Sequence, residues 1–244
     1  EMGPHRRFDW FEMPLEDLKK VRRALGCTLN DVVLATVAGA GRELLIRQGH
    51  DPARRRFRVA APVSVRKEEE RGKLGNRVSS WLIDLPVNVS DPLERVERIA
   101  AKTRELKASR NALGVQMLMR MADWTPTTLL SLGARAATGQ VDLIVTNVPG
   151  PQFPLYMAGA KTLALYPQVP LVAGTPLGIA LFSYDGKLCW GFNAEYDQYR
   201  LLWQFCEDIR SSFREISEQA LSSATKKVAE PAAKTVADGS TVKK

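Results

Sequence analysis

The sequence predicts an α/β protein of the α+β type, with a mixed β-sheet flanked by helices, on three observations. About seven strand-like and six helix-like segments are interspersed without the strict alternation that an all-parallel sheet requires. One helical segment is apolar on every face, which is typical of a helix buried at the centre of a domain. The chain has 244 residues, of which 45% are hydrophobic, and this is enough for one sizeable core.

The first two predicted elements are a strand and a helix. Residues 6–13 contain three aromatic side chains and predict a strand, because aromatic residues suit the pleated surface of a sheet. Pro14 suits the first position of a helix, where no backbone N–H is needed. This helix is expected to run to about Leu25 and to end at Gly26, since glycine readily adopts the left-handed conformation found there.

The apolar helix follows, and it begins with Thr28-Leu29-Asn30-Asp31. A threonine followed three residues later by an acid, ahead of an apolar run, is typical of a capping box. Each of the two side chains is expected to accept from the other residue's backbone N–H. Asn30 is not needed for this cap. A buried helix that carries an unused carboxamide in its first turn is a candidate for the base of a functional site.

The middle of the chain predicts two strands and an amphipathic helix. Residues 57–66 indicate a strand in which Pro62 argues for an edge or a bulge, and residues 75–87 indicate a second strand after a charged loop. A helix from Asp91 to about residue 110 starts with a cap residue, a proline and an acid. One face of this helix carries Leu93, Val96, Ala100, Thr103 and Leu106.

The C-terminal half predicts two shorter helices within residues 111–140, then a strand at 141–146 that leads into a rigid turn at 147–151. Asp185-Gly186 is a strong signal for a type I′ hairpin. Further strands and a last helix are expected at 161–165, 178–184, 187–193 and 201–221. Residues 1–222 are predicted to form one domain, and the Lys- and Ala-rich residues 223–244 a disordered tail.

The formal charge of +8 indicates a basic surface, with a local cluster at Arg54, Arg55, Arg56 and Arg58. Such a surface suits nucleic acid, anionic lipid or a phosphorylated small molecule. Because zinc-finger spacing, ribonucleoprotein motifs and interleaved aromatic and basic residues are absent from the sequence, nucleic acid is the weakest of the three and is not expected as a partner.

The cysteines and histidines do not indicate a catalytic or metal centre. Cys27, Cys189 and Cys206 are scattered and odd in number, which suggests reduced thiols that fill the core of a cytoplasmic protein. His5 and His50 lack partners at metal-ligand spacing, so no metal site is expected. An obvious general base is therefore missing from the chain.

A membrane-spanning helix is not expected. Residues 162–184 are uncharged and long enough, but their three prolines break a helix. A signal peptide is not visible at the start of the sequence. We expect a cytoplasmic protein that could rest on the surface of a membrane or lipid droplet.

Three groups of polar residues remain as candidate site residues. Thr28-Leu29-Asn30-Asp31 is one, and its simpler interpretation is a structural cap. Gly75-Asn76-Arg77 is either a turn into a strand or an amide and a cation at a cleft edge. Asn147-Val148-Pro149-Gly150-Pro151 is either a stiff turn or the wall of a channel into which Asn147 points. Met117, Met119, Met121 and Trp124 could line an acyl pocket, although helix core is the simpler interpretation.

Five segments in the same order resemble the C-terminal half of the bacterial wax ester synthase/diacylglycerol acyltransferase family. The resemblance covers roughly residues 6–220, and NVPGP is its most specific single piece. The segments are TLNDVVLATVAGAGRELL, LGNRVSSWLIDLPV, DPLERVERI, VTNVPGPQFPLYMAGAK and LGIALFSYDGKLCWGFNAEYD.

The resemblance implies one lobe of a two-lobe acyltransferase similar to chloramphenicol acetyltransferase, with a tunnel between the lobes. The family's catalytic H-H-x-x-x-D-G motif belongs to the N-terminal lobe and is absent from this sequence. Its histidine would take the proton of an alcohol, diacylglycerol or a long-chain alcohol, and the alkoxide would attack an acyl-CoA thioester. Acyl-CoA enters as a substrate, and no cofactor is implied. The alternative is a non-catalytic module of the same fold that binds acyl-CoA, lipid or a partner lobe.

The resemblance also assigns roles to individual residues. Asn30 and Asp31 match the family's N-D pair near the tunnel, with Asn30 as a candidate donor to the oxyanion and Asp31 as its structural partner. Asn76 and Arg77 are expected at the substrate, as are Asn147, Pro149 and Gly150. Arg77 and the arginines at 54–58 are candidates for binding the CoA phosphates.

Overall fold

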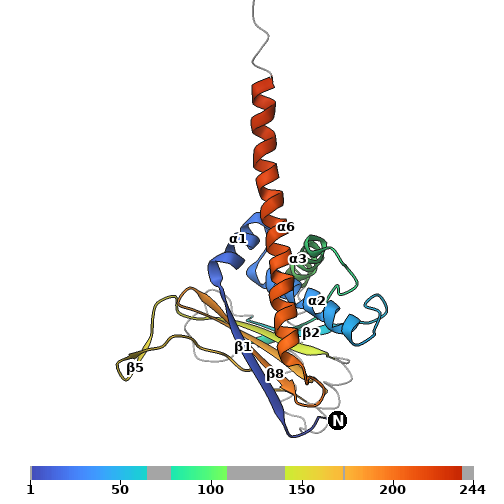
Figure 1. Cartoon of the computed structure of the whole chain (residues 1–244), viewed down its shortest axis with the longest axis vertical. Helices are drawn as coiled ribbons and strands as arrows, with labels where there is room; N and C mark the ends of the chain where they lie inside the picture. The colour runs from blue at the N-terminus through green and yellow to red at the C-terminus, as the bar shows by residue number, and fades with distance from the viewer. Residues whose placement is uncertain (1, 65–77, 109–140, 173, 238–244) are drawn as a thin grey trace, which may run out of the picture.

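The computed structural model describes residues 2–64, 78–108, 141–172 and 174–237, and side chains are described except at 63–64, 78–80 and 224–237. Strands and helices are interspersed as predicted (Figure 1). The helices are α1 (Leu15–Leu25), α2 (Leu29–Arg47), α3 (Pro92–Ala108) and α6 (Leu202–Ala237). The strands are β1 (Arg6–Pro14), β2 (Arg58–Ser64), β3 (Val78–Asp84), β4 (Leu143–Pro149), β5 (Tyr156–Met157), β6 (Ala160–Lys161), β7 (Leu177–Tyr184) and β8 (Lys187–Glu195).

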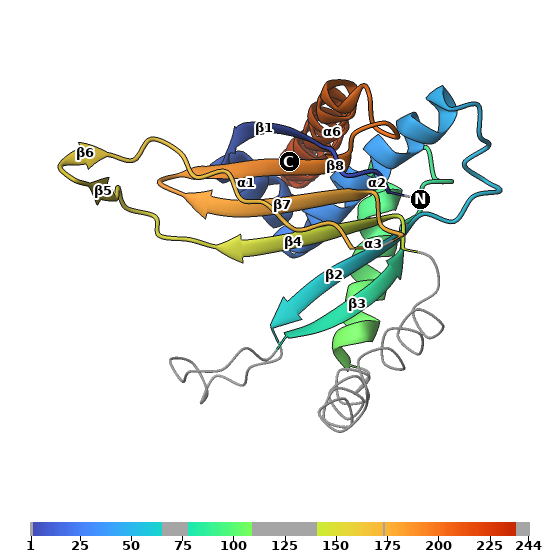
Figure 2. The ribbon, with the colours of Figure 1, turned by 90° about the horizontal axis from the view of Figure 1, so that it is seen from below.

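The main sheet has six strands in the order β1-β8-β7-β4-β2-β3. β4 runs parallel to both of its neighbours, β2 and β7, and the other pairs are antiparallel. The prediction of a mixed sheet with flanking helices is therefore confirmed. β5 and β6 form a separate small hairpin that extends away from the main sheet (Figure 2).

One face of the sheet carries the core and the helices. Side chains that alternate along β7 and β8 point to this face, because successive residues of a strand point to opposite sides. Ile179, Leu181, Trp190 and Phe192 are all fully buried there. The ring of Phe205 from α6 meets Phe192 edge to face with centroids 6.4 Å apart, so α6 packs directly on the sheet.

The opposite face is partly covered by residues 162–172, which cross it without regular secondary structure. A Cβ atom on Gly191 would lie 1.8 Å from the carbonyl oxygen of Pro167, so only glycine permits this close approach. Asn193 Nδ2 donates to the carbonyl oxygen of Val169 at 3.2 Å. The strand predicted at 161–165 is wrong except for Lys161, since the segment lies over the sheet face rather than beside a strand edge.

Helix α2 is buried on every side along most of its length, as its composition predicts. Its two internal glycines give neighbouring elements room to approach. A Cβ atom would lie 2.1 Å from Ser212 Oγ of α6 at Gly39, and 2.9 Å from the ring of Phe57 at Gly41. The small residues of α2 therefore set how closely α6 and the chain before β2 pack against it.

The predicted capping box at the start of α2 is confirmed. The backbone N–H of Thr28 donates to Asp31 Oδ2 at 2.8 Å, and that of Asp31 donates to Thr28 Oγ1 at 3.2 Å. The second carboxylate oxygen, Oδ1, accepts from the Thr103 hydroxyl of α3 at 2.7 Å. One buried carboxylate, 2% exposed, thus joins the cap of α2 to α3.

The prediction for Pro62 is only partly correct. β2 lies inside the sheet between β4 and β3, so it is not an edge strand. However, β2 pairs with β4 only at Val59 and Ala60, and Pro62 comes after this pairing has ended. The proline thus lies where β2 no longer has a neighbour on that side, which is a position that tolerates a residue without an N–H.

Several predicted boundaries change. Asn147 and Pro149, expected in a turn, continue β4 and pair with Leu181 and Ser183 of β7, so the turn prediction is wrong for these residues. The hairpin at Asp185-Gly186 is confirmed, with positive φ angles of 44° and 81°. α6 does not stop at Leu221 but continues to Ala237 and projects beyond the rest of the fold (Figure 1). The helices predicted within 111–140 lie outside the described residues.

In the part of the chain that the structure describes, no single helix is long and apolar enough to span a membrane. Only α1 and α2 taken together reach the required length and composition, and they are bent by 99° relative to each other.

Changing Asp31 to alanine is expected to lower the melting temperature of the ligand-free chain. The change removes the Asp31 half of the capping box and the partner of the Thr103 hydroxyl, at a combined cost of about 2 kcal/mol. Thermal unfolding followed by circular dichroism tests this. The control is Asp197→Ala at an exposed carboxylate, which should unfold like the parent. Equal melting of both variants and the parent would contradict the structural role of Asp31.

Changing Gly191 to alanine is expected to displace residues 162–172 from the sheet, because the new methyl group overlaps the Pro167 carbonyl. Limited chymotrypsin digestion should then cut faster at Tyr166. In the control, Gly3→Ala, the new methyl group meets only one carboxylate oxygen of Glu195, at 3.1 Å, and no atom of residues 162–172. Unchanged cleavage at Tyr166 in the Gly191 variant would show that the segment does not rest on this glycine.

Candidate functional site

A pocket of about 390 Å³ lies between the start of α2 and the sheet, and we call it the fork pocket. It takes residues from α2, α3 and three strands. The lining residues are Thr28, Asn30, Asp31, Val33, Leu34, Ala61, Pro62, Trp81, Thr103, Lys107, Val145 and Asn147.

The divergence of β2 from β4 positions this pocket. The two strands pair at Val59 with Leu143 and at Ala60 with Ile144, and then separate. Beyond the point of separation each strand stays paired on its other side, β2 with β3 and β4 with β7. The next residues on each strand, Ala61 and Val145, line the pocket. Figure 2 shows β2 and β3 turning away from β4 at this point.

Two carboxamides meet at the fork pocket. Asn147 Nδ2 donates to Asn30 Oδ1 at 2.8 Å, although 116 residues separate the two in the sequence. Asn30 is exposed and Asn147 is half-buried. Among the described residues, the amide nitrogen of Asn30 has no hydrogen-bond partner, while its oxygen is occupied. The pair therefore leaves the two N–H groups of Asn30 available to an acceptor in the pocket.

Asp31 lies beside Asn30 but has a different role. Its carboxylate accepts from Thr28 N–H and from the Thr103 hydroxyl, and the side chain is buried. Both oxygens are occupied in holding α2 and α3 together. This geometry fits the structural role predicted for Asp31, and it leaves Asn30 as the residue of this turn with an amide nitrogen free of described partners.

The structure does not bring every predicted site residue into the pocket. Asn147 lines it, whereas Pro149 and Gly150 do not. Gly150 instead packs on β7, where a Cβ atom would lie 2.3 Å from the Phe182 ring, and its N–H donates to Ser183 Oγ at 3.1 Å. Asn76 and Arg77 lie outside the described residues, as do the methionines at 117–121 and Trp124.

Sequence analysis missed the roles of Thr103 and Trp81. Thr103 is the one polar residue on the predicted apolar face of α3, and this exception could have indicated a buried partner. Trp81 pairs with Ala61 across β2 and β3, so it lines the pocket from the neighbouring strand. Finding it requires the strand register, which the sequence does not contain.

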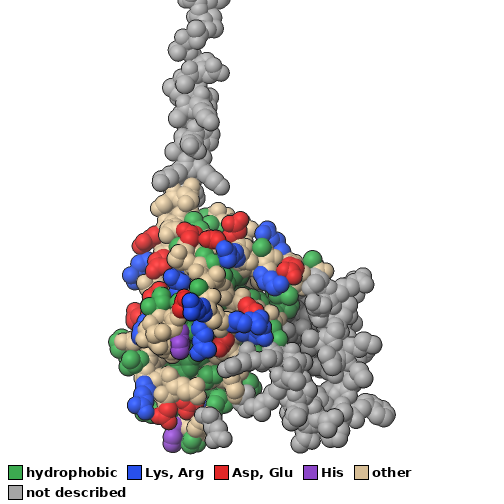
Figure 3. Space-filling view, turned by 90° about the vertical axis from the view of Figure 1, so that its right-hand side faces the viewer, with side chains coloured by type: hydrophobic (Ala, Val, Ile, Leu, Met, Phe, Trp, Pro, Cys, Tyr) green, Lys and Arg blue, Asp and Glu red, His purple; other side chains and the backbone are tan. Residues whose placement is uncertain are grey.

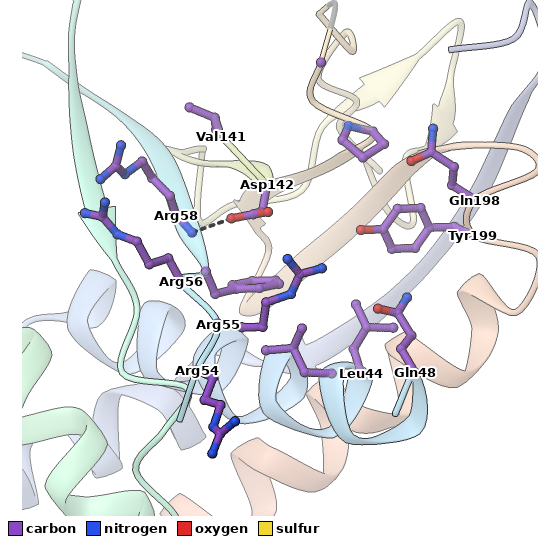
Figure 4. A pocket seen from close by; sticks show the side chains of 14 residues that line it. Leu44, Gln48, Arg54, Arg55, Arg56, Arg58, Val141, Asp142, Gln198 and Tyr199 are labelled. Carbon is purple, nitrogen blue, oxygen red and sulfur yellow. Dashed lines mark hydrogen bonds between the residues drawn. The ribbon is translucent and has the colours of Figure 1, made fainter. Parts of the chain in front are cut away.

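A second pocket, of about 510 Å³, holds the arginine cluster and lies at the other end of α2 (Figure 4). Leu44 of this pocket is fourteen residues from Asn30, or about 20 Å along the helix. Fully buried core residues such as Val37 and Leu143 lie between the two ends. The structure therefore does not bring the arginines at 54–58, predicted to bind CoA phosphates, together with Asn30.

Carboxylates engage much of the arginine cluster. Asp84 accepts from Arg56 Nη2 at 2.6 Å and from Arg58 Nε at 2.8 Å, and both arginines hold the pKa of Asp84 below its usual value. Asp142 accepts from the backbone N–H of Arg58 at 2.7 Å, and burial raises the pKa of this carboxyl. Figure 4 shows Arg55 pointing toward Tyr199 across the pocket. Basic and acidic side chains are similarly mixed over the face in Figure 3.

The histidines and cysteines lie away from the fork pocket. His50 Nε2 is 3.5 Å from Arg55 Nη2, and the ring of His5 is near Tyr196. All three cysteines are free, and burial raises the pKa of the Cys27 thiol to about 11. Within the described residues, the fork pocket is therefore lined by neither a histidine nor a cysteine, and its ionisable side chains are those of Asp31 and Lys107.

Comparison with solved structures supports the fold. A wax ester synthase/diacylglycerol acyltransferase from Marinobacter aquaeolei VT8 is 25% identical, with a TM-score of 0.68, over 90% of this chain and 50% of that one. The epimerization domain from the third module of tyrocidine synthetase B is 14% identical, with a TM-score of 0.62 over 89% of this chain and 49% of that one, and so shows the fold alone.

Comparison of sequences identifies the family. A Mycobacterium tuberculosis H37Rv protein, named as a probable diacylglycerol O-acyltransferase, is 34% identical over 196 residues, which are 79% of this chain and 42% of the relative. The chain thus spans less than half the length of this relative. Residues 1–33, which include Asn30 and Asp31, match the wax ester synthase/diacylglycerol acyltransferase catalytic domain. Residues 74–217 match the C-terminal domain of the same enzymes, and the chain belongs to the wax ester synthase/diacylglycerol acyltransferase family.

Proposed function

We propose that this chain is the C-terminal lobe of an acyl-CoA-dependent O-acyltransferase that esterifies diacylglycerol or a long-chain alcohol. The observation that carries the proposal is the Asn30–Asn147 pair at the fork pocket, which leaves amide donors free beside a partly apolar cavity. The match of residues 1–33 to the family's catalytic domain supports a role for this segment in the reaction.

In the proposed reaction, a histidine of the N-terminal lobe takes the proton from the alcohol hydroxyl. The alcohol oxygen attacks the thioester carbonyl carbon, and the carbonyl oxygen becomes negatively charged. The C–S bond then breaks, the ester forms, and the CoA sulfur receives the proton. The N–H groups of Asn30 stabilise the oxyanion, because an amide donor whose orientation is already fixed needs no reorganisation as charge develops.

Asn147 acts as a positioning residue in this proposal. By donating to Asn30 Oδ1, it fixes the orientation of the amide and so directs the free N–H groups of Asn30 away from β4. The buried Asp31 holds the first turn of α2 in place below them. Acyl-CoA is the substrate that donates the acyl group, and the proposed reaction uses no cofactor.

The second candidate function is a non-catalytic module that binds acyl-CoA, a lipid or a partner lobe. The position of the two histidines, away from the fork pocket among the described residues, favours this reading for the chain in isolation. The two functions differ in whether the assembled lobes turn over acyl-CoA.

Changing Asn30 to alanine, with both lobes present, is expected to lower kcat about 10²–10³-fold, because one oxyanion donor is lost. KM for acyl-CoA and the melting temperature should stay near the parent values, since Asn30 is exposed and outside the capping box. Asn147→Asp should also lower kcat, because a carboxylate cannot donate to Asn30. Asn88→Ala, at an exposed asparagine, is the control.

Steady-state kinetics with palmitoyl-CoA and a diacylglycerol acceptor measure these effects. A kcat within threefold of the parent for Asn30→Ala would place the donor elsewhere. A collapse of the melting temperature would show that Asn30 is part of the folded core.

The isolated chain is expected to have no acyltransferase activity. The physical reason is the missing general base, as neither His5 nor His50 lines the fork pocket. Release of free CoA from palmitoyl-CoA, in the presence of diacylglycerol, gives the measurement. Activity of the purified chain that disappears on changing His50 to glutamine would contradict the proposal.

A further inference from the structure

We infer that the fork pocket holds the acyl chain of the substrate, and that Ala61 and Trp81 set the chain length it accepts. This inference rests on the proposed acyltransferase function. The divergence of two parallel strands inside an otherwise regular sheet is the observation that motivates it.

The divergence is abrupt and is confined to one pair of strands. β2 and β3 pair along seven residues, as do β4 and β7, whereas β2 and β4 pair at two. A continuous sheet would bring Ala61 beside Val145 and leave no space between them and α2. Because the strands separate there, a cavity forms between α2 and the sheet, and these two residues lie on either side of it.

The cavity has a polar end and an apolar end. Asn30 and Asn147 form the polar end, with free N–H groups suited to a carbonyl oxygen. The apolar end is lined by Val33 and Leu34 of α2 and by Val145 of β4, which are at most 4% exposed. A molecule with a polar carbonyl joined to a hydrocarbon chain fits this arrangement, and its thioester would lie at Asn30.

The walls from β2 and β3 determine how far the chain can enter. Ala61 and Trp81 face each other across the β2–β3 pair and lie on the helix side of the sheet. Ala61 is 8% exposed and Trp81 is half-buried. A larger side chain at 61 would fill part of the cavity, whereas a smaller one at 81 would extend it.

The test measures binding of saturated acyl-CoAs, from butanoyl to dodecanoyl, to the whole chain by isothermal titration calorimetry. In the parent, affinity should rise about three- to fourfold for each methylene that becomes buried, up to the length the pocket holds, and then level off. Ala61→Leu should move the levelling point to a shorter chain, and Trp81→Ala should move it to a longer one.

The chain offers a matched control for each variant. Ala60 is the neighbour of Ala61 on the opposite face of the sheet, so Ala60→Leu should leave the length dependence unchanged. Trp10 is half-exposed, at 51%, and lies on that same outer face, so Trp10→Ala should also have no effect. Melting temperatures show whether each variant is folded, and Trp81→Ala keeps the test valid if Ala61→Leu is not.

An affinity in the parent that does not depend on chain length would overturn the inference, as would equal shifts for Ala61→Leu and Ala60→Leu. The failure of the proposed function has a different signature, because the assembled lobes would then bind acyl-CoA with the expected length dependence but form no ester. Opposite shifts in the two pocket variants, with unchanged controls, would establish the acyl site.

Discussion

The burial of α2 is the constraint on which the rest of the structure depends. Exposing any face of an all-apolar helix to water is unfavourable, so other elements must bury its apolar part on every side. The sheet covers one side (Figure 2), and α1, α3 and α6 pack on the others. Two internal glycines allow close approach, at Ser212 of α6 and at Phe57 before β2. The order of the remaining elements around α2 follows from this need.

The N-terminus of α2 lies at the border of the core, where its first turn lines the fork pocket. The backbone N–H groups in the first turn of a helix need partners, and a buried carboxylate, Asp31, provides one of them. Because the Asp31 carboxylate also binds Thr103, it anchors α3 and closes one side of the fork pocket. Because Asp31 completes the cap, the side chain of Asn30 is not needed for it, and in the proposed reaction this amide is available to the substrate.

The sheet forms the second half of the site because β2 and β4 stop pairing after two residues. Because β2 and β4 each stay paired on their outer sides, their separation leaves a cavity within the sheet rather than a strand without any partner. Asn147 lies on β4 beyond this separation, in place to donate to Asn30. A donor pair held by a helix and a strand is better fixed than one held on loops, which is the arrangement that electrostatic stabilisation of an oxyanion requires.

Local sequence determined most of the elements and one half of the candidate site. The capping box at Thr28 and Asp31, the all-apolar character of α2, the amphipathic face of α3 and the Asp185-Gly186 turn depend on residues within a few positions of each other, so the sequence predicts them directly. Asn30 was identified for the same reason, as a carboxamide that its own helix does not use.

Only the tertiary structure decided which distant residues meet. Asn147 was predicted in a turn but extends β4, because pairing with β7 outweighs the turn preference of the following Pro149 and Gly150. The separation of β2 from β4, and with it the positions of Ala61 and Trp81 around the fork pocket, depends on strand register. The arginine cluster lies at the far end of α2 for a similar reason, since the length of a buried helix places its two ends about 20 Å apart. Sequence preferences act over a few residues, whereas register and separation are set by the packing of the whole core.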